Sequence, residues 1–172
     1  HFLVIRPHAA SPGGTVLDDH HDAPAHTDTS WPRAARVLGV GLALWWTPVL
    51  LTGWWQGTSG VLFQEGLFFS KAAVVTFGGA YAVLPYVYQG AVDHYGWLTP
   101  TQMIDGLALG ETTPGPLIMV VAFVGFVGAY VQQVFGADQL FLAGAVAATL
   151  VTWFTFLPSF IFILAGGPLV ES

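Results

Sequence analysis

The sequence contains no cysteine, which excludes disulfide frameworks, thiolate metal sites and cysteine nucleophiles. Charge is also scarce, because Asp, Glu, Lys and Arg make up 8% of the 172 residues, whereas a typical soluble domain has about 25%. Hydrophobic residues account for 54%. This balance is typical of a membrane protein. The formal net charge of −6 argues against a nucleic-acid-binding groove.

The few charges are unevenly distributed. Residues 1–36 hold four of the ten acidic residues, three of the four Lys and Arg residues and five of the six histidines. They show no apolar periodicity and are interrupted by proline and glycine, so we expect a flexible tail or linker over 1–36. Its run Asp18-Asp19-His20-His21-Asp22 has no second ligand cluster to support it, and we expect neither a metal site nor a cofactor.

The remaining residues, 37–172, read as a transmembrane domain. Val37–Trp55 is an uncharged run of the length that crosses a bilayer, and Arg33 and Arg36 before it indicate a cytoplasmic start. We predict an all-α, multi-pass helical bundle with broken helices. The predicted segments are 37–55, 61–77, 80–92, 100–111, 116–134 and 139–165. Small residues within them, Gly125, Gly128, Gly144 and Ala148, are expected to let helices pack closely.

Two of these helices are predicted to be interrupted. Gly78-Gly79 weakens one helix, and the run Thr112-Thr113-Pro114-Gly115-Pro116 ends another near Glu111. Broken helices at membrane depth persist only where protein buries them or where they line a wet cavity. Two of them in one short chain point to a substrate site. The alternative is that both are simple loops outside the membrane.

The helix starts after these breaks predict an anion site. Each start exposes free backbone N–H groups and the positive end of a helix dipole. Proline supplies no N–H group, so the backbone donors at the second break should be those just after it. Hydroxyl groups nearby add further donors. The predicted anion-binding residues are Lys71, Thr76, Gly78, Gly79, Ala80, Tyr81, Thr112, Thr113, Pro114, Gly115, Pro116, Leu117 and Ile118.

Two charged side chains near the breaks each have two possible roles that the sequence does not distinguish. Lys71 is the only Lys or Arg in 37–172, and it either attracts anions or is a snorkelling or ion-paired lysine. Glu111 lies beside the proline break, where it either couples proton movement to anion movement or pairs with Lys71. Asp93-His94 is interpreted as a loop at the membrane interface.

Several motifs resemble the chromate ion transporter family. The glycine pair with its flanks carries the signature, and four further blocks follow in the same order. The matching stretches are Phe77–Pro85, Gly96–Thr99 with Asp105–Gly110, Pro114–Pro116, Gly125-Phe126 and Phe156–Phe160. Ala80 stands where first halves of long members usually carry proline, so the chain resembles a second half. Glu111 stands where many members carry glutamine.

The resemblance implies transport of tetrahedral oxyanions across the cytoplasmic (inner) membrane. Chromate, often exported to give resistance, is the expected cargo, and sulfate is the related substrate. Expected partners are the lipid bilayer and a second related half, in the same chain or in a partner subunit. The chain begins with His and its last apolar segment ends near its last residue, so we expect a piece of a longer protein.

Other classes are less favoured by the residues. A membrane enzyme would need a nucleophile with a base or a metal cluster, and only His94, beside Asp93, offers such chemistry in 37–172. We therefore expect that this protein is not an enzyme. An oxyanion carrier of unknown direction and a non-transporting membrane scaffold subunit remain as alternatives.

Overall fold

The structure, a computed structural model, describes residues 31–75, 83–112 and 118–170. Every element in these ranges is helical and none is a strand, so the all-α prediction is confirmed. The elements are α1 (Trp31–Gln56), α2 (Val61–Val75), α3 (Val83–Tyr88), the π-helix η2 (Gln89–His94), α4 (Pro100–Thr112), α5 (Ile118–Val131), the 3₁₀-helix η3 (Ala137–Gln139) and α6 (Leu140–Val170).

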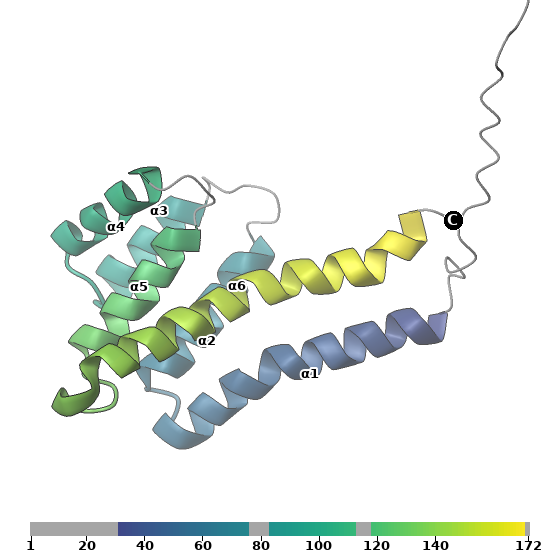
Figure 1. The fold of residues 1–172 in the computed structure, drawn as a ribbon, viewed down its shortest axis with the longest axis horizontal. Helices are drawn as coiled ribbons and strands as arrows, with labels where there is room; N and C mark the ends of the chain where they lie inside the picture. The colour runs from purple at the N-terminus through teal and green to yellow at the C-terminus, as the bar shows by residue number, and fades with distance from the viewer. Residues whose placement is uncertain (1–30, 76–82, 113–117, 171–172) are drawn as a thin grey trace, which may run out of the picture.

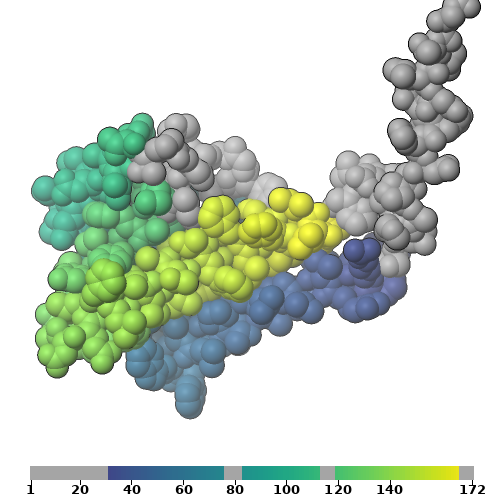
Figure 2. Space-filling view, viewed as in Figure 1, coloured from purple at the N-terminus to yellow at the C-terminus, as the bar shows by residue number. Residues whose placement is uncertain are grey.

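Two long helices form one side of the molecule. α1 and α6 lie side by side and extend past the other helices, which gather near one end of this pair (Figure 1). The space-filling view shows α6 running along the front of the molecule with α1 beside it (Figure 2). α2 packs against both long helices and also against α5 and α3. The fifteen residues of α2 are therefore the centre of the fold.

The long helices have the dimensions and surface of membrane spans. Trp31–Gln56 and Ala137–Gly166 are long and apolar enough to cross a bilayer, and Met119–Val131 is apolar but shorter. Trp31 and Trp54, at opposite ends of α1, are 77% and 87% exposed. They are about 35 Å apart along the axis at 1.5 Å per residue. This spacing suits anchoring at the two faces of a hydrocarbon core about 30 Å thick.

Several polar side chains on the helices form hydrogen bonds within the protein. Five threonine hydroxyls donate to the carbonyl four residues earlier in their own helix, which hides them from lipid. They belong to Thr47, Thr52, Thr112, Thr149 and Thr155. The Trp45 indole N–H donates to the Ser70 hydroxyl at 2.8 Å, and the Trp153 indole N–H donates to the Leu44 carbonyl at 3.2 Å. These two bonds join α1 to α2 and to α6.

Helix bounds differ from the predicted segments at several places, among them the end of α5, which lies at Val131 and not at the predicted 134. α1 begins at Trp31, so the predicted tail 1–36 extends too far, because Pro32 fits the first turn of a helix and does not break it. α6 runs through Pro158 to Val170, past the predicted end at 165. The predicted segment 80–92 contains α3 and the π-helix η2 as far as His94. The spacing of apolar residues in the sequence does not distinguish the wider turn of a π-helix from that of an α-helix.

The start of α4 is fixed by a reciprocal cap. The Thr99 N–H donates to Gln102 Oε1 at 2.9 Å, and the Gln102 N–H donates to Thr99 Oγ1 at 3.3 Å. This is the capping box expected of a threonine followed three residues later by glutamine. The cap follows Trp97, whose N–H donates to the Ala91 carbonyl at 2.8 Å and whose side chain is 2% exposed. The connection from η2 to α4 is therefore anchored in the core.

Small residues allow α5 and α6 to pack closely, as predicted. A Cβ added at Gly125 would lie 2.8 Å from Val151 Cγ2 and 3.3 Å from the Ala147 carbonyl oxygen, both on α6. A Cβ added at Gly144 would lie 2.8 Å from the Phe126 ring. Both positions have no room for a methyl group, so the close approach of the two helices depends on glycine.

We expect Gly125→Ala to lower the free energy of unfolding by about 1–3 kcal/mol, because the added methyl group overpacks the α5–α6 interface. Gly39→Ala is the matched control, since Gly39 lies on α1 with no atom within 4 Å of its added Cβ. It should be neutral or stabilising, since alanine favours a helix by up to about 1 kcal/mol over glycine. Thermal unfolding in detergent micelles compares them. Equal effects of the two changes would contradict the packing interpretation.

Candidate functional site

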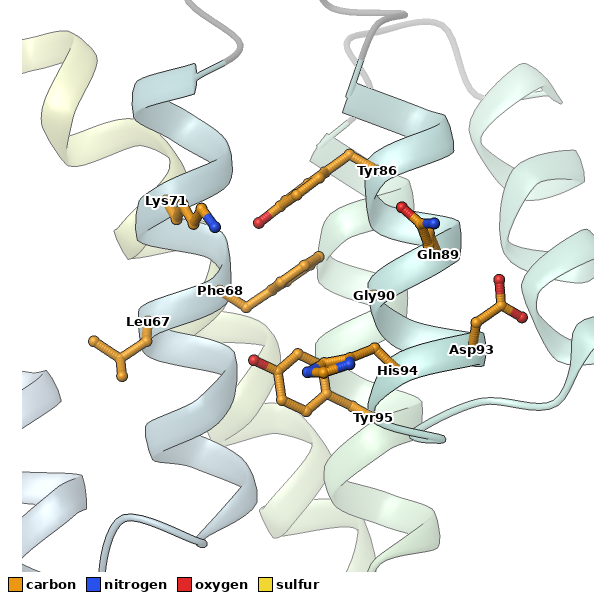
Figure 3. Close-up of a pocket in the computed structure, with 9 residues that line it drawn as sticks. All are labelled: Leu67, Phe68, Lys71, Tyr86, Gln89, Gly90, Asp93, His94 and Tyr95. Atoms are coloured by element: carbon orange, nitrogen blue, oxygen red, sulfur yellow. The ribbon is translucent and has the colours of Figure 1, made fainter.

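A cavity of about 450 Å³ lies between α2 and the continuous stretch formed by α3 and η2. In Figure 3, Phe68, Lys71 and Tyr86 project toward the space between these two walls, whereas Leu67 and Asp93 lie at its edge and point away from it. α2 contributes Leu67, Phe68 and Lys71, and the other wall contributes Tyr86, Gln89, Gly90, Asp93, His94 and Tyr95.

Aromatic rings hold the two walls together. Phe68 of α2 stacks on Tyr86 of α3, with ring centroids 4.8 Å apart and planes 5° from parallel. Phe68 also meets Tyr95 edge-on at 5.8 Å. A Cβ at Gly90 would clash with the Phe68 ring, so glycine is needed for η2 to approach α2 this closely. These contacts fix the width of the cavity beside Lys71.

Lys71 gives the cavity its positive charge. Its side chain is exposed, and within the described ranges no salt bridge joins it to a carboxylate. Figure 3 shows the Lys71 amino group and the Tyr86 hydroxyl projecting toward the same space, whereas the Asp93 carboxylate points away from it. An ammonium group and a phenol are both hydrogen-bond donors. A cavity with convergent donors is suited to an anion.

Most of the predicted anion site lies outside the described residues. This applies to Thr76, Gly78, Gly79, Ala80, Tyr81, Thr113, Pro114, Gly115, Pro116 and Leu117. Ile118 is described only as the first residue of α5. The described residues place the edges of these segments: α2 ends at Val75 and α3 begins at Val83, so residues 76–82 connect the two walls of the cavity.

The two remaining predicted residues lie at the end of α4. Thr112 and Glu111 are both exposed. The Thr112 hydroxyl donates to the Ala108 and Leu109 carbonyls at 2.9 and 3.1 Å, so its hydrogen is used within the helix and is not directed at a ligand. Glu111 forms no salt bridge with Lys71 in the described structure, so the alternative of an ion pair between them is not realised there.

The cavity contains side chains that the sequence interpretation missed. Asp93-His94 was expected in an interface loop, but these residues form the last part of η2 and line the cavity with Tyr86 and Gln89. The His94 ring meets Tyr95 edge-on at 4.5 Å. A signal was present: residues 86, 89, 90, 93 and 94 follow the spacing of one helix face, and most of them are polar. Polar residues on one face of an otherwise apolar helix indicate a wet surface.

Comparison with known proteins gives consistent matches. A family model described as chromate transporter matches residues 63–172. A chromate transport protein of Pseudomonas aeruginosa is 39% identical over 135 residues, which are 76% of this chain and 28% of that protein. A chromate transport protein of Cupriavidus metallidurans is 33% identical over 108 residues, 63% of this chain and 23% of that protein.

An uncharacterized transporter of Methanocaldococcus jannaschii is 31% identical over 111 residues, 64% of this chain and 24% of that protein. The chain therefore spans about a quarter of the length of these three relatives. No solved structure matches the chain.

The absence of cysteine from this chain allows a direct accessibility test. We expect the thiol of Lys71→Cys to react readily with a water-soluble thiol reagent, because this position is exposed at the cavity. Val124→Cys is the control, since Val124 is fully buried in the core. Its thiol should react at least about tenfold more slowly, because access controls thiol reactivity. Mass spectrometry of the labelled protein measures both rates, and equal rates would contradict the described cavity.

Proposed function

This chain belongs to the chromate transporter family, and on that premise we propose that it moves tetrahedral oxyanions across the cytoplasmic (inner) membrane. The proposed cargo is chromate, exported in a way that gives resistance, with sulfate as a related substrate. Two of the relatives are named chromate transport proteins, which supports chromate as the cargo. The family match covers more than half of the chain, so the proposal does not depend on a single motif.

The observation that carries this proposal is the cavity at Lys71. A doubly charged anion in a mostly apolar membrane domain needs compensating positive charge, and Lys71 is the only Lys or Arg after residue 36. Lys71 lies about one helical turn before α2 ends at Val75. The segment that follows contains Gly78 and Gly79 and leads to the opposite wall of the cavity. We propose that the backbone N–H groups of this segment and the Lys71 ammonium bind the same anion.

The second predicted break supplies the other side of the proposed site. Residues 113–117 lie between α4 and α5, which pack against each other. The N–H group of Ile118, the first residue of α5, and that of Leu117 before it in the chain are proposed as donors to the anion. Glu111 comes just before this segment at the exposed end of α4, where an acidic side chain influences the approach of anions.

Alternating access between two related halves is the proposed mode of transport. The exposed apolar surface of α1 and α6 supports it, since such a surface must be covered by lipid or by another membrane helix. The second half would lie in the remainder of a longer chain or in a partner subunit. The short coverage of the relatives is consistent with this arrangement.

We expect Lys71→Gln to reduce chromate uptake into liposomes containing the complete protein. A hydrogen bond from a charged donor contributes about 1.5–3 kcal/mol, so the apparent affinity should fall by about ten- to a hundredfold. Lys71→Arg is the matched control, since it keeps the charge and should retain most of the affinity. Unchanged affinity in Lys71→Gln would reject the side-chain part of the proposed site.

Gly79→Leu tests the backbone part of the site and the scaffold alternative together. A leucine side chain would block close approach of an anion to the backbone, so we expect flux to be lost while the protein still accumulates in the membrane. Flux assays in liposomes and the elution volume of the purified protein measure the two properties. A scaffold subunit would instead show altered assembly, and normal flux would reject the glycine-pair site.

A further inference from the structure

Glu65 lies on a different side of α2 from the cavity. It is 1% exposed, and both of its carboxyl oxygens are buried without a hydrogen-bond partner in the described structure. Glu65 and Lys71 are six residues apart, so their side chains leave α2 about 120° apart around its axis. α2 thus carries the cavity cation on one face and an unpartnered buried carboxyl group on another.

The carboxyl group occupies a space that a glycine leaves open. A Cβ added at Gly128 of α5 would lie 2.7 Å from Glu65 Oε1 and 3.3 Å from Trp97 Cβ. Trp97 is itself 2% exposed. The carboxyl group is therefore enclosed by α5 and the Trp97 side chain. Gly128 was predicted to serve helix packing alone, but the structure shows that it also makes room for Glu65.

No described ionisable group pairs with Glu65. α6 has no titratable side chain in residues 140–166, and no hydrogen bond or salt bridge joins Glu65 to groups on the other packed elements. Those groups are Arg33 and Arg36 on α1, Lys71 on α2 itself, Tyr130 on α5, Tyr86 and Tyr88 on α3, and Asp93 and His94 on η2 with Tyr95 after it.

A proton is the ligand that fits this site. A metal cation requires several oxygen or nitrogen ligands, and the described residues contain no group of three His, Asp or Glu that could supply them. A lone carboxyl group can still bind one proton. The neutral acid is also the form that an apolar enclosure tolerates, because an unpaired buried charge is strongly disfavoured.

We propose that Glu65 is a proton-binding site that couples the anion flux of this protein to a proton gradient, an inference that rests on the proposed transport function. The carboxyl group holds its proton while α2 and α5 enclose it. It can pass the proton to water only when α2 moves away from Gly128 and Trp97. Because Lys71 lies on the same helix, that movement also changes the anion cavity, so proton release and anion release are linked.

Glu65 and Glu111 differ in a way that an experiment can separate. Glu111 is exposed, so its carboxyl group is open to water without any helix movement. A carboxyl group in open contact with water can influence flux without linking it to a gradient. Glu65 exchanges its proton only during a conformational change, which is the property that coupling requires.

The test uses the complete protein in liposomes at alkaline pH, where chromate carries both charges, with the membrane voltage held at zero. Exchange of labelled for unlabelled chromate at equal pH on both sides measures transport without coupling. The steady-state accumulation ratio under a pH gradient measures coupling. One coupled proton should change that ratio about tenfold per pH unit. The variants are Glu65→Gln, Glu111→Gln and, as an exposed control on η3, Asp138→Asn.

We expect Glu65→Gln to keep exchange and to lose the tenfold response, while Glu111→Gln and Asp138→Asn keep that response. If the wild-type protein shows no exchange, the proposed function fails. If exchange is present and Glu65→Gln still responds tenfold per pH unit, the Glu65 inference is overturned and the proposed function stands.

If the Glu65→Gln protein does not exchange chromate, a second measurement tests the inference without transport. Infrared difference spectra of the purified wild-type protein, taken with and without chromate, should contain a protonated carboxyl band. We expect Glu65→Asp to shift that band and Glu65→Gln to abolish it. A wild-type spectrum without a chromate-sensitive carboxyl band, or a band that both substitutions leave unchanged, would overturn the inference.

Discussion

The structure depends on one constraint, which is that a polar group in a lipid layer finds no water and must be satisfied by the protein. Threonine hydroxyls on the helices donate hydrogen bonds to carbonyl groups of their own helix. The Trp45 and Trp153 indole N–H groups donate hydrogen bonds to neighbouring helices. Against this background an unsatisfied polar group is conspicuous. The Glu65 carboxyl group on α2 is such a group in the described structure, as is the Gln56 side-chain carbonyl at the end of α1. Lys71, also on α2, is exposed and forms no salt bridge there.

Lys71 and Glu65 both lie on the central helix α2, so a movement of this helix affects the surroundings of both. The helix contacts both long helices on one side and α5 and α3 on others, so a movement of α2 would change several interfaces together. One face carries the free cation of an open cavity, and another carries a carboxyl group enclosed by Gly128 and Trp97. A transporter needs an accessible substrate site and a protected site whose state changes with conformation. α2 offers candidates for both.

Membership of the chromate transporter family follows from matches over most of the membrane part, and it fixes the class of protein. The chain spans only about a quarter of its curated relatives, however, and the exposed apolar faces of α1 and α6 leave a large surface for lipid or for another half. Completion of the anion path by a second related half is part of the proposed function.

Composition, length and local motifs are enough to establish the helical class, the long apolar spans and the family. The sequence also directed attention to Lys71, the only cation in 37–172. The folded structure was needed to show that Asp93 and His94 line a cavity, because its other wall is α2, a separate helix whose approach to η2 no local pattern shows. It alone decided that Glu65 is buried beside Gly128, because contacts between residues more than sixty positions apart leave no local signal.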